Sequence, residues 1–486
     1  MNNNKQVTTN FFWRLAERCG AQGVTFLVSI VLARVLGPTV FGTVALVTVF
    51  TSIMQVFVDS GMGNALIQKK DADDLDFSSV FYFNMVACSA LYLVMFFLAP
   101  IIAWFYDSPE LTSIIRVLSI IILVSGIKNV QQAYVSRKML FKKFFFATLG
   151  GTIGAAIVGI VMAYCGFGVW AIVAQMLFNT AVDTLILWIT VKWRPIRAFS
   201  FDRLKRLFSY GWKLLVSALL ETVYNDLSQL IIGKVYSKGD LAQYNQGKRF
   251  PQFIVTNVNS SIDSVLLPTM SQAQDNVSAV RNMTRRAIKV STYVMMPAMV
   301  GLAVCAEPMI RLVLTDEWLP CVPFLRIFCV SFAFWPIHTA NLNAIKAMGR
   351  SDIFLYLEII KKVIGIIAIV STMFISVKAL AYSLLLTSIL SQIINAFPNR
   401  KLLNYSYLSQ FKDMIPQIAL STFMGVLIYC IKFFGLCDLF TLLLQIVLGV
   451  IVYIIGSKLL KIDSFDYLLS TIRGLFKKGK KENMSE

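Results

Sequence analysis

Residues 213–263 read KLLVSALLETVYNDLSQLIIGKVYSKGDLAQYNQGKRFPQFIVTNVNSSID. The stretch is apolar enough for two long membrane helices joined at Val235–Asp240. Within these helices it also carries the ionisable residues Lys213, Glu221, Asp226, Lys248, Arg249 and Asp263. An ionisable group at membrane depth costs about 2.5–3.5 kcal/mol on insertion scales, so it normally faces a water-filled cavity or a partner. The stretch therefore predicts a hairpin that either lines a polar lumen or lies outside the membrane.

The composition of the whole chain excludes a hairpin outside the membrane. Apolar residues make up 57% of the 486 residues, and the mean hydropathy is +0.69, which is too apolar for a soluble chain of this size. Apolar spans of about 20 residues recur from end to end, each long enough to cross about 30 Å of hydrocarbon. The polar start and the long first span do not fit a cleaved signal peptide. We therefore expect an all-α polytopic protein of the bacterial inner (cytoplasmic) membrane.

The spacing of the apolar spans predicts about 14 transmembrane helices. We expect them at residues 10–33, 42–66, 77–102, 112–134, 145–164, 169–191, 208–233, 241–270, 285–305, 322–345, 353–374, 377–397, 413–433 and 439–459. With both termini in the cytoplasm, most of the 45 Lys and Arg residues fall in cytoplasmic loops and helix ends. The exceptions predicted on the opposite side are Arg34, Lys234, Lys238, Arg311, Lys378 and Lys432. This bias follows the positive-inside rule and sets the predicted topology.

The net charge of +19 follows from the same loops. Because the basic residues cluster where cytoplasmic loops are expected, they indicate orientation and contact with anionic membrane lipids, and not binding of nucleic acid. The eight cysteines form no CxxC pair, and His338 is the single histidine. We therefore expect no metal site and no cofactor.

The two halves of the chain follow a similar pattern. A shift of the sequence by 200 residues aligns Arg34 with Lys234 and Phe50 with Phe250, without a gap. Both halves then read as a long helix, a short turn and a second long helix, which is typical of transporters built from repeats. The domains predicted from this are an N-terminal six-helix lobe at 1–200, a second six-helix lobe at 201–400, peripheral helices at 401–460 and a basic cytoplasmic tail at 461–486.

Several turn motifs resemble those of a known family. The segment LARVLGPTVFG at residues 32–42 resembles the LxRxLGPxxFG turn of bacterial polysaccharide exporters. The segments IIGK at 231–234 and LAQY at 241–244 are similar to the matching turn of the second lobe, with Ala242 in place of the usual glycine. LLPTMS at 266–271 and AMGRSD at 347–352 also resemble family segments. The resemblance covers about residues 10–400 and points to the multidrug/oligosaccharidyl-lipid/polysaccharide flippase superfamily, in its Wzx-type and teichuronic- or colanic-acid-type branch.

The resemblance implies a V-shaped pair of six-helix lobes that work by alternating access, with two peripheral C-terminal helices. It also implies a cargo, which is a sugar repeat unit on undecaprenyl diphosphate. The cargo would move to the periplasmic leaflet for assembly of O-antigen, capsule or exopolysaccharide. A polysaccharide polymerase and glycosyltransferases would be further partners.

The charged residues within the predicted spans agree with such a cargo. The cations are Lys128, Lys213, Lys248, Arg249, Arg326, Lys361 and Lys362, and they outnumber the acids Asp59, Asp183, Glu221, Asp226, Asp263 and Glu358. A cationic lumen suits a diphosphate, because Arg and Lys form charge-assisted hydrogen bonds with phosphate oxygens. Sugars need amide partners, and we expect Asn225 and Asn257 to be among them. Glu221, Asp226 and Asp59 are candidates either for coupling-ion carriers or for simple counter-ions.

Two other functions are compatible with a polytopic membrane chain. A drug or cation antiporter of the same superfamily would use Asp59, Glu221 and Asp226, but surplus positive charge in the lumen would repel a cationic drug. A membrane enzyme would need a catalytic loop or a cofactor site. The predicted loops are shorter than about 20 residues, below the scale of even a small domain, and no glycine-rich phosphate loop or metal cluster occurs. We therefore expect a transporter with no catalytic residues.

Overall fold

The computed structural model describes residues 2–59, 62–69 and 71–470. By their contacts these fall into two compact units, Met1–Ala242 and Gln243–Glu486. Unit 1 holds α1 (Asn2–Asp59), α2 (Met62–Gln68), α3 (Asp74–Phe105), α4 (Glu110–Leu118), α5 (Ile120–Arg137), α6 (Phe141–Tyr164), α7 (Val169–Thr190) and α8 (Phe201–Val235). The helix α9 (Lys238–Gln272) begins in unit 1 and continues in unit 2.

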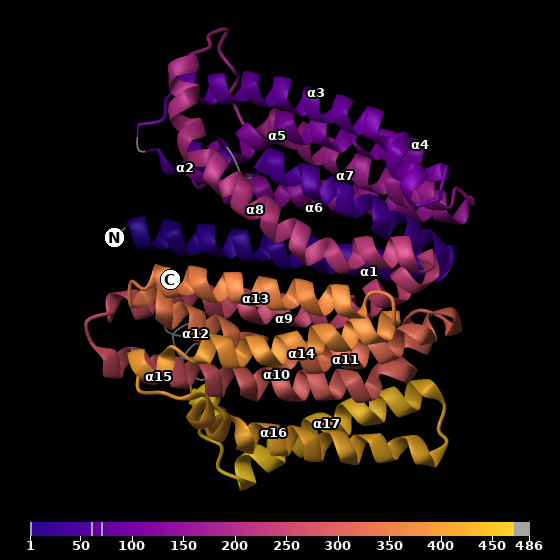
Figure 1. The fold of residues 1–486 in the computed structure, drawn as a ribbon, viewed down its shortest axis with the longest axis vertical. Helices are drawn as coiled ribbons and strands as arrows, with labels where there is room; N and C mark the ends of the chain where they lie inside the picture. The colour runs from indigo at the N-terminus through magenta and orange to yellow at the C-terminus, as the bar shows by residue number, and fades with distance from the viewer. Residues whose placement is uncertain (1, 60–61, 70, 471–486) are drawn as a thin grey trace. The chain divides into compact units, whose positions relative to one another are not determined.

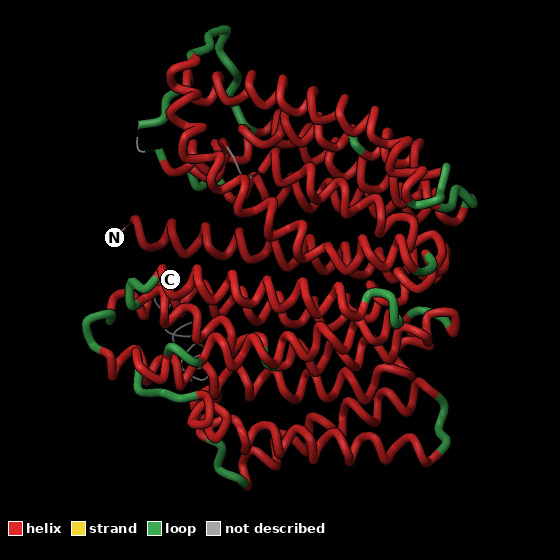
Figure 2. The backbone as a smooth tube through the Cα atoms, viewed as in Figure 1, coloured by secondary structure: helices red, strands yellow, loops and turns green. Residues whose placement is uncertain are grey.

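Unit 2 is also helical. After α9 it holds α10 (Val277–Val313), η1 (Asp316–Cys321), α11 (Val322–Ala333), α12 (Trp335–Ala347), α13 (Ser351–Thr372), α14 (Val377–Ala396), α15 (Asn399–Leu402), α16 (Tyr407–Cys430), η2 (Ile431–Phe434) and α17 (Asp438–Leu459). The described residues contain no strand (Figure 2). Of the predicted basic tail, residues 463–470 are helical and residues 471–486 lie outside the described part.

The helices match the predicted spans. Ten helical stretches of the described chain are long and apolar enough to cross a membrane. Both halves of α1 count there as one stretch, and the long helices α8, α9 and α13 lie outside these ten because they are more polar or more charged. The all-α polytopic fold is thus confirmed, and the predicted number of about 14 spans is compatible with it.

Side-chain caps explain where several helices begin. The Asp73 carboxylate accepts a hydrogen bond from the Asp76 backbone N–H at 3.0 Å, and the Asp76 carboxylate accepts one from the Asp73 N–H at 3.2 Å. This reciprocal capping box satisfies two backbone donors at the start of α3. Four other helices have a simpler cap, in which one side-chain oxygen accepts a backbone hydrogen bond. The capping residues are Ser200 for α8, Asn276 for α10, Ser376 for α14 and Ser406 for α16.

The predicted turn between the first two spans lies at Gly37. Gly37 has a φ of 70°, which a residue without Cβ adopts at little cost. Pro38 follows and cannot donate the backbone hydrogen bond that would continue the first helical segment. The chain then returns toward the end at which α1 begins (Figure 1). The sequence LGPT therefore joins two spans within α1.

The two family-like turns of unit 1 pack directly on each other. A Cβ built at Gly42 would lie 1.9 Å from the backbone oxygen of Lys238, which belongs to the turn after α8. A Cβ at Gly233 would lie 2.1 Å from Cδ2 of Leu46. Any side chain at Gly42 would therefore collide with the backbone. The glycine at the end of the first motif is required by contact with the second motif.

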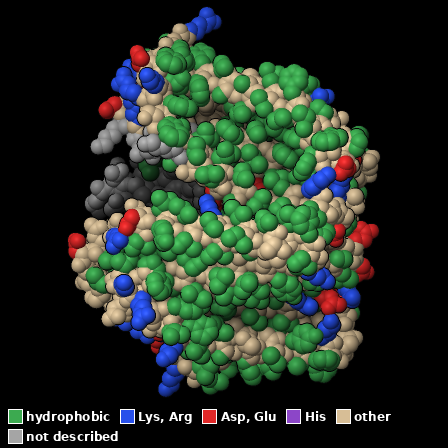
Figure 3. All heavy atoms as spheres, in the orientation of Figure 1, with side chains coloured by type: hydrophobic (Ala, Val, Ile, Leu, Met, Phe, Trp, Pro, Cys, Tyr) green, Lys and Arg blue, Asp and Glu red, His purple; other side chains and the backbone are tan. Residues whose placement is uncertain are grey.

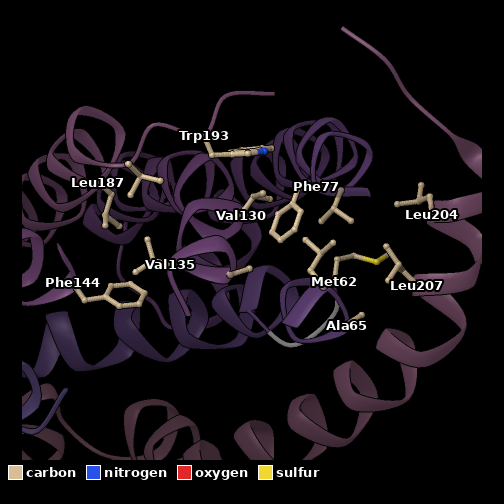
Figure 4. Packing of buried hydrophobic residues seen from close by; sticks show 14 of the residues in the cluster. Met62, Ala65, Phe77, Val130, Val135, Phe144, Leu187, Trp193, Leu204 and Leu207 are labelled. Atoms are coloured by element: carbon tan, nitrogen blue, oxygen red, sulfur yellow. The ribbon is translucent and has the colours of Figure 1, made fainter. Parts of the chain in front are cut away.

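The hydrophobic core of unit 1 explains the position of α8. Phe77 of α3, Val130 of α5 and Leu207 of α8 lie in one buried cluster (Figure 4). Trp193, in the segment after α7, closes this cluster with its ring centroid 5.8 Å from that of Phe77. α8 contacts α1, α2 and α3 and therefore belongs to unit 1. Unit 1 accordingly ends at Ala242, and not near residue 200. The division into functional lobes at residues 200 and 400 stays a prediction.

In unit 2, α10 contacts α11, α12, α16 and α17. Two buried tyrosines fix α17 to α10: the Tyr293 hydroxyl donates to Ser457 Oγ at 2.9 Å, and the Tyr453 hydroxyl donates to the Tyr293 carbonyl at 2.8 Å. Hydrophobic side chains cover the visible sides of α13, α14 and α17, while charged side chains gather near the helix ends (Figure 3). This distribution is that of helices whose sides face lipid.

Candidate functional site

The in-span cation Lys128 of unit 1 has an acidic partner. Its Nζ lies 3.1 Å from Asp183 Oδ2, which joins α5 to α7, and the Asp183 residue is only 8% exposed. The other carboxylate oxygen of Asp183 has no hydrogen-bond partner among the described residues. Since a buried ion pair is costly to break, Lys128 and Asp183 depend on each other. Lys128 therefore contributes no surplus charge.

The predicted acid Asp59 lies at the end of α1 within a chain of amides. Its Oδ1 accepts a hydrogen bond from Gln55 Nε2 at 3.0 Å and one from Asn129 Nδ2 at 3.5 Å. The Asn129 Oδ1 in turn accepts from Asn84 Nδ2 at 3.4 Å. Since Asn129 follows Lys128 in α5, the structure brings two of the predicted site residues, Asp59 and Lys128, to neighbouring positions. Asn84 and Asn129 carry no charge, so the count of charged residues within the spans does not point to them.

The other candidate acids of unit 1 lie on α8. Asp226 accepts hydrogen bonds from Ser52 Oγ at 2.9 Å and from Gln229 Nε2 at 3.0 Å, which links α8 to α1. Glu221 accepts from Asn225 Nδ2 at 3.1 Å, and both of these residues are exposed. Ser52 and Gln229 are neutral, so these two hydrogen bonds do not neutralise the charge of an ionised Asp226. The side chain of Lys213, also on α8, lies outside the described part of the structure.

The adjacent cations Lys248 and Arg249 lie on α9, and the packing of Gly247 places them. A Cβ at Gly247 would lie 2.6 Å from Phe324 Cβ and 2.8 Å from the backbone nitrogen of Leu325, so this face of α9 meets α11. Successive helical residues are about 100° apart, so Lys248 and Arg249 point away from this contact. Both are half-buried. Among the described carboxylates, none lies within 4.0 Å of the Arg249 guanidinium.

Other in-span residues of unit 2 have partners within the same unit. Lys361 forms an ion pair of 2.5 Å with Glu358, one turn away on α13. Asp263 of α9 accepts a hydrogen bond from Asn343 Nδ2 at 2.8 Å. The exposed Asn257 donates its Nδ2 to the Phe253 carbonyl of its own helix at 2.8 Å. Lys361, like Lys128, is therefore neutralised within its own unit.

Arg326 lies on another surface of α11. Its Nε donates to the Ala303 carbonyl of α10 at 3.2 Å, and its side chain lines a cavity with α10, α16, η2 and α17. The neighbouring residues Phe324 and Leu325 face α9 instead. The structure thus joins Lys248 and Arg249 on one helix and places Arg326 in a separate pocket of the same unit. Binding of substrate by all the predicted residues, at a common site, stays a prediction.

Comparison with known proteins gives this arrangement a context. A family model described as "Polysaccharide biosynthesis protein" matches residues 31–323. The succinoglycan biosynthesis transport protein ExoT of Rhizobium meliloti is 24% identical over 74% of this chain and 73% of its own length. The teichuronic acid biosynthesis protein TuaB of Bacillus subtilis is 25% identical over 63% and 64%, and the lipopolysaccharide biosynthesis protein WzxC of Escherichia coli is 22% identical over 70% of each chain.

Solved structures share the fold. The lipid II flippase MurJ in an inward closed conformation superposes with a TM-score of 0.73 at 17% identity and covers 95% of this chain and 99% of its own. A second structure is entitled an inward-facing MATE-family multidrug resistance transporter of the MOP superfamily. It superposes with a TM-score of 0.64 at 15% identity, and the match covers 80% of this chain and 98% of that one. The resemblance seen in the turn motifs is thus confirmed. The chain is a multi-pass bacterial membrane protein that belongs to the polysaccharide biosynthesis protein family.

Proposed function

We propose that the chain is a flippase that moves an oligosaccharide repeat unit, carried on a lipid diphosphate, from the cytoplasmic to the periplasmic leaflet. The names of three relatives support this, because they refer to biosynthesis of succinoglycan, teichuronic acid and lipopolysaccharide, and the first refers also to transport. The fold supports it too, since it resembles that of a lipid II flippase. Both termini would lie in the cytoplasm, as the distribution of basic residues predicts.

One observation carries the proposed site. Arg249 is half-buried on α9, which the sequence predicts to span the membrane, and no described carboxylate lies within 4.0 Å of its guanidinium. A cation at membrane depth without such a counter-ion is costly unless an anion or water reaches it. The guanidinium fork forms two parallel hydrogen bonds with phosphate oxygens. Arg249, next to Lys248, is therefore our first candidate for the residue that holds the diphosphate during transport.

The other predicted residues stay candidates for contact with the cargo, each within its own unit. Lys213 would add positive charge from α8, and Asn225 and Asn257 would donate amide hydrogen bonds to sugar hydroxyls. The lipid tail would stay in the bilayer. Asp226 is the stronger of the candidate coupling acids, because it is half-buried while Glu221 and Asp59 are exposed, and its hydrogen bonds from Ser52 and Gln229 come from neutral groups. A proton or a sodium ion would then compensate its charge.

The test is polymer export in a flippase-null strain supplied with defined repeat units, with and without a proton gradient. The double variant Lys248→Gln/Arg249→Gln is expected to reduce export at least tenfold at unchanged abundance in the membrane. The matched control is Arg400→Gln/Lys401→Gln, which removes the same two charges from adjacent exposed positions. Arg326→Gln is measured alone, because Arg326 lies in a separate pocket. Export by the α9 double variant at the level of the control would refute the assigned site.

A MATE-like antiporter of drugs or cations is the second candidate function, because the fold also resembles that of a MATE-family transporter. The proposal would shift to this function if the chain conferred drug efflux in a sensitive strain and failed to restore polymer export. Since the relatives named above are polysaccharide biosynthesis proteins, we expect the opposite result.

A further inference from the structure

A charged cavity lies where four membrane helices of unit 2 begin or end. It has a volume of about 180 Å³ and is lined from the end of α10, the start of α11, the end of α16 with η2, and the start of α17. Its polar lining consists chiefly of Glu307, Arg311, Arg326, Lys432, Asp438 and Gln445. At about 30 Å³ for each water molecule in the liquid, the cavity has room for about six waters, or for a small polar group of similar size.

The positive groups of the cavity are unequally engaged. Lys432 Nζ lies 2.7 Å from Glu307, and Arg311 lies 3.4 Å from Glu307 and 3.9 Å from Asp438. Arg326 differs, because its Nε donates to a backbone carbonyl and no described carboxylate lies within 4.0 Å of it. A guanidinium has five N–H donors in a fork that matches phosphate oxygens. The cavity thus offers an anion a planar donor group that no carboxylate occupies.

Gln445 of α17 needs a hydrogen-bond donor, whereas Arg326 needs an acceptor. Gln445 is 2% exposed, and its Nε2 donates to the Ile428 carbonyl at 3.1 Å. Its Oε1, however, has no hydrogen-bond partner among the described residues. Buried polar atoms are rarely left unpaired in folded proteins. An amide oxygen accepts only, so the cavity calls for a donor at this place, and the carboxylate of Asp438 lies on the same wall of α17.

The two requirements together describe a zwitterion. One end of the ligand would be an anion that takes donors from Arg326, and the other would be a cationic or N–H-bearing group that donates to Gln445 and Asp438. The helix ends that form the cavity lie at the predicted boundary between membrane and water, where the headgroups of phospholipids lie. The lining also includes Leu436 and Tyr429, an apolar and an amphipathic side chain of the kind common at that boundary.

We propose that this cavity binds the headgroup of a zwitterionic phospholipid, with its phosphate on Arg326 and its ammonium group between Asp438 and Gln445. The acyl chains would lie along the lipid-facing sides of α16 and α17. The site is separate from the diphosphate site proposed on α9, and it needs no transport to be detected. Bound lipid would tie the last two membrane helices to α10 and α11.

The experiment measures lipid retained by the purified full-length protein, using native mass spectrometry after reconstitution with equal amounts of phosphatidylethanolamine and phosphatidylglycerol. The two lipids share the phosphate, and only the first carries an ammonium group. We expect wild type to retain phosphatidylethanolamine at least fivefold more than phosphatidylglycerol. Arg326→Gln should reduce this retention at least fivefold, and Arg326→Lys should restore part of it. Arg400→Gln, the same charge change at an exposed position of α15, should leave it unchanged.

Asp438→Asn tests the other end of the headgroup, and the preference for phosphatidylethanolamine should then fall to about twofold or less. Soluble phosphoethanolamine and inorganic phosphate, added in place of lipid, distinguish a lipid site from a site for a free phosphate. Equal retention of both lipids by wild type would overturn the proposal. The same conclusion would follow if Arg326→Gln retained lipid like wild type, or if the soluble phosphates bound and the lipids did not.

Discussion

A buried polar contact in unit 1 differs in kind from one in unit 2. In unit 1 the interior contact between α5 and α7 is an ion pair, Lys128 with Asp183. In unit 2 a buried contact between α12, α15 and α16 is made by amides alone: Asn341 exchanges two hydrogen bonds of 2.9 Å with Gln410, and Asn399 donates to Asn341 at 2.7 Å. An ion pair that loses one member leaves a buried charge, whereas an amide network that loses one leaves neutral groups unpaired. The loss of one member should therefore cost more stability in the Lys128–Asp183 pair than in the amide network of unit 2.

The largest effect is expected for Asp183→Asn. The substitution keeps the shape of the side chain but leaves Lys128 charged and without its carboxylate, which costs about 3–5 kcal/mol for a buried pair. The measurement is chemical or thermal unfolding of the detergent-purified protein, together with its abundance in the membrane. Asp275→Asn, at an exposed position in a turn, is the control and should change little.

The double variant Lys128→Met/Asp183→Leu sharpens the first prediction. It removes both charges at once, so most of the stability lost in Asp183→Asn should return. If the double variant were no more stable than the single one, the loss would come from packing and the ion pair would not explain the difference between the units.

A smaller effect is expected for Asn341→Leu in unit 2. The side chain is fully buried, and its removal leaves the amides of Gln410 and Asn399 without their partner, at a cost of about 1–3 kcal/mol. The same unfolding measurement applies. Asn341→Leu/Gln410→Leu should lose less than the sum of the two single losses, because the two side chains bond each other. A loss for Asn341→Leu that equals or exceeds the loss for Asp183→Asn would contradict the comparison.

The smallest effect is expected at the exposed end of unit 1, where the Arg203 guanidinium contacts Asp73. The hydrogen bond from Arg203, helped by the Asp76 N–H, lowers the pKa of Asp73 from 3.8 to about 2. Because the folded pKa lies below the ordinary value, the contact stabilises unit 1 above about pH 4, and its contribution is lost as the pH falls through about 2.

Asp73→Asn tests this pH dependence. Asparagine is also a good helix cap, so the start of α3 should survive. The wild type should unfold at a slightly higher temperature than the variant at about pH 5, and the difference should shrink as the pH is lowered toward 2. A difference that stays constant over this range would show that the charge of Asp73 is not its source. We expect a small shift, since exposed ion pairs contribute about 0–1 kcal/mol.

The sequence alone was enough to predict the all-α polytopic fold, because apolar segments of about 20 residues recur along the whole chain. It also located the turn at Gly37, since a Gly-Pro pair has few other conformations between two such segments. The position of α8 in unit 1 was less accessible. It depends on contacts such as that of Leu207 with the cluster around Phe77, and these join residues that are far apart in the chain.

The candidate site was predicted only in part, because a charge count does not give partners. The counted surplus of cations included Lys128, whose partner Asp183 lies 55 residues away on another helix. It also included Arg326, and only the structure shows that its Nε donates to the Ala303 carbonyl of α10. The sequence shows a glutamine at position 445 within an apolar span. It does not show that the Oε1 atom of Gln445 lacks a hydrogen-bond partner among the described residues.

The contact between Gly42 and the Lys238 backbone also bears on how this chain can change during evolution. Substitutions in a lipid-facing helix exchange one apolar surface for another, and most are tolerated. At Gly42 even a single methyl group would force two turns apart that are almost 200 positions distant in the sequence. A saturation library should therefore find fewer viable codons at Gly42 than at most leucines of the spans.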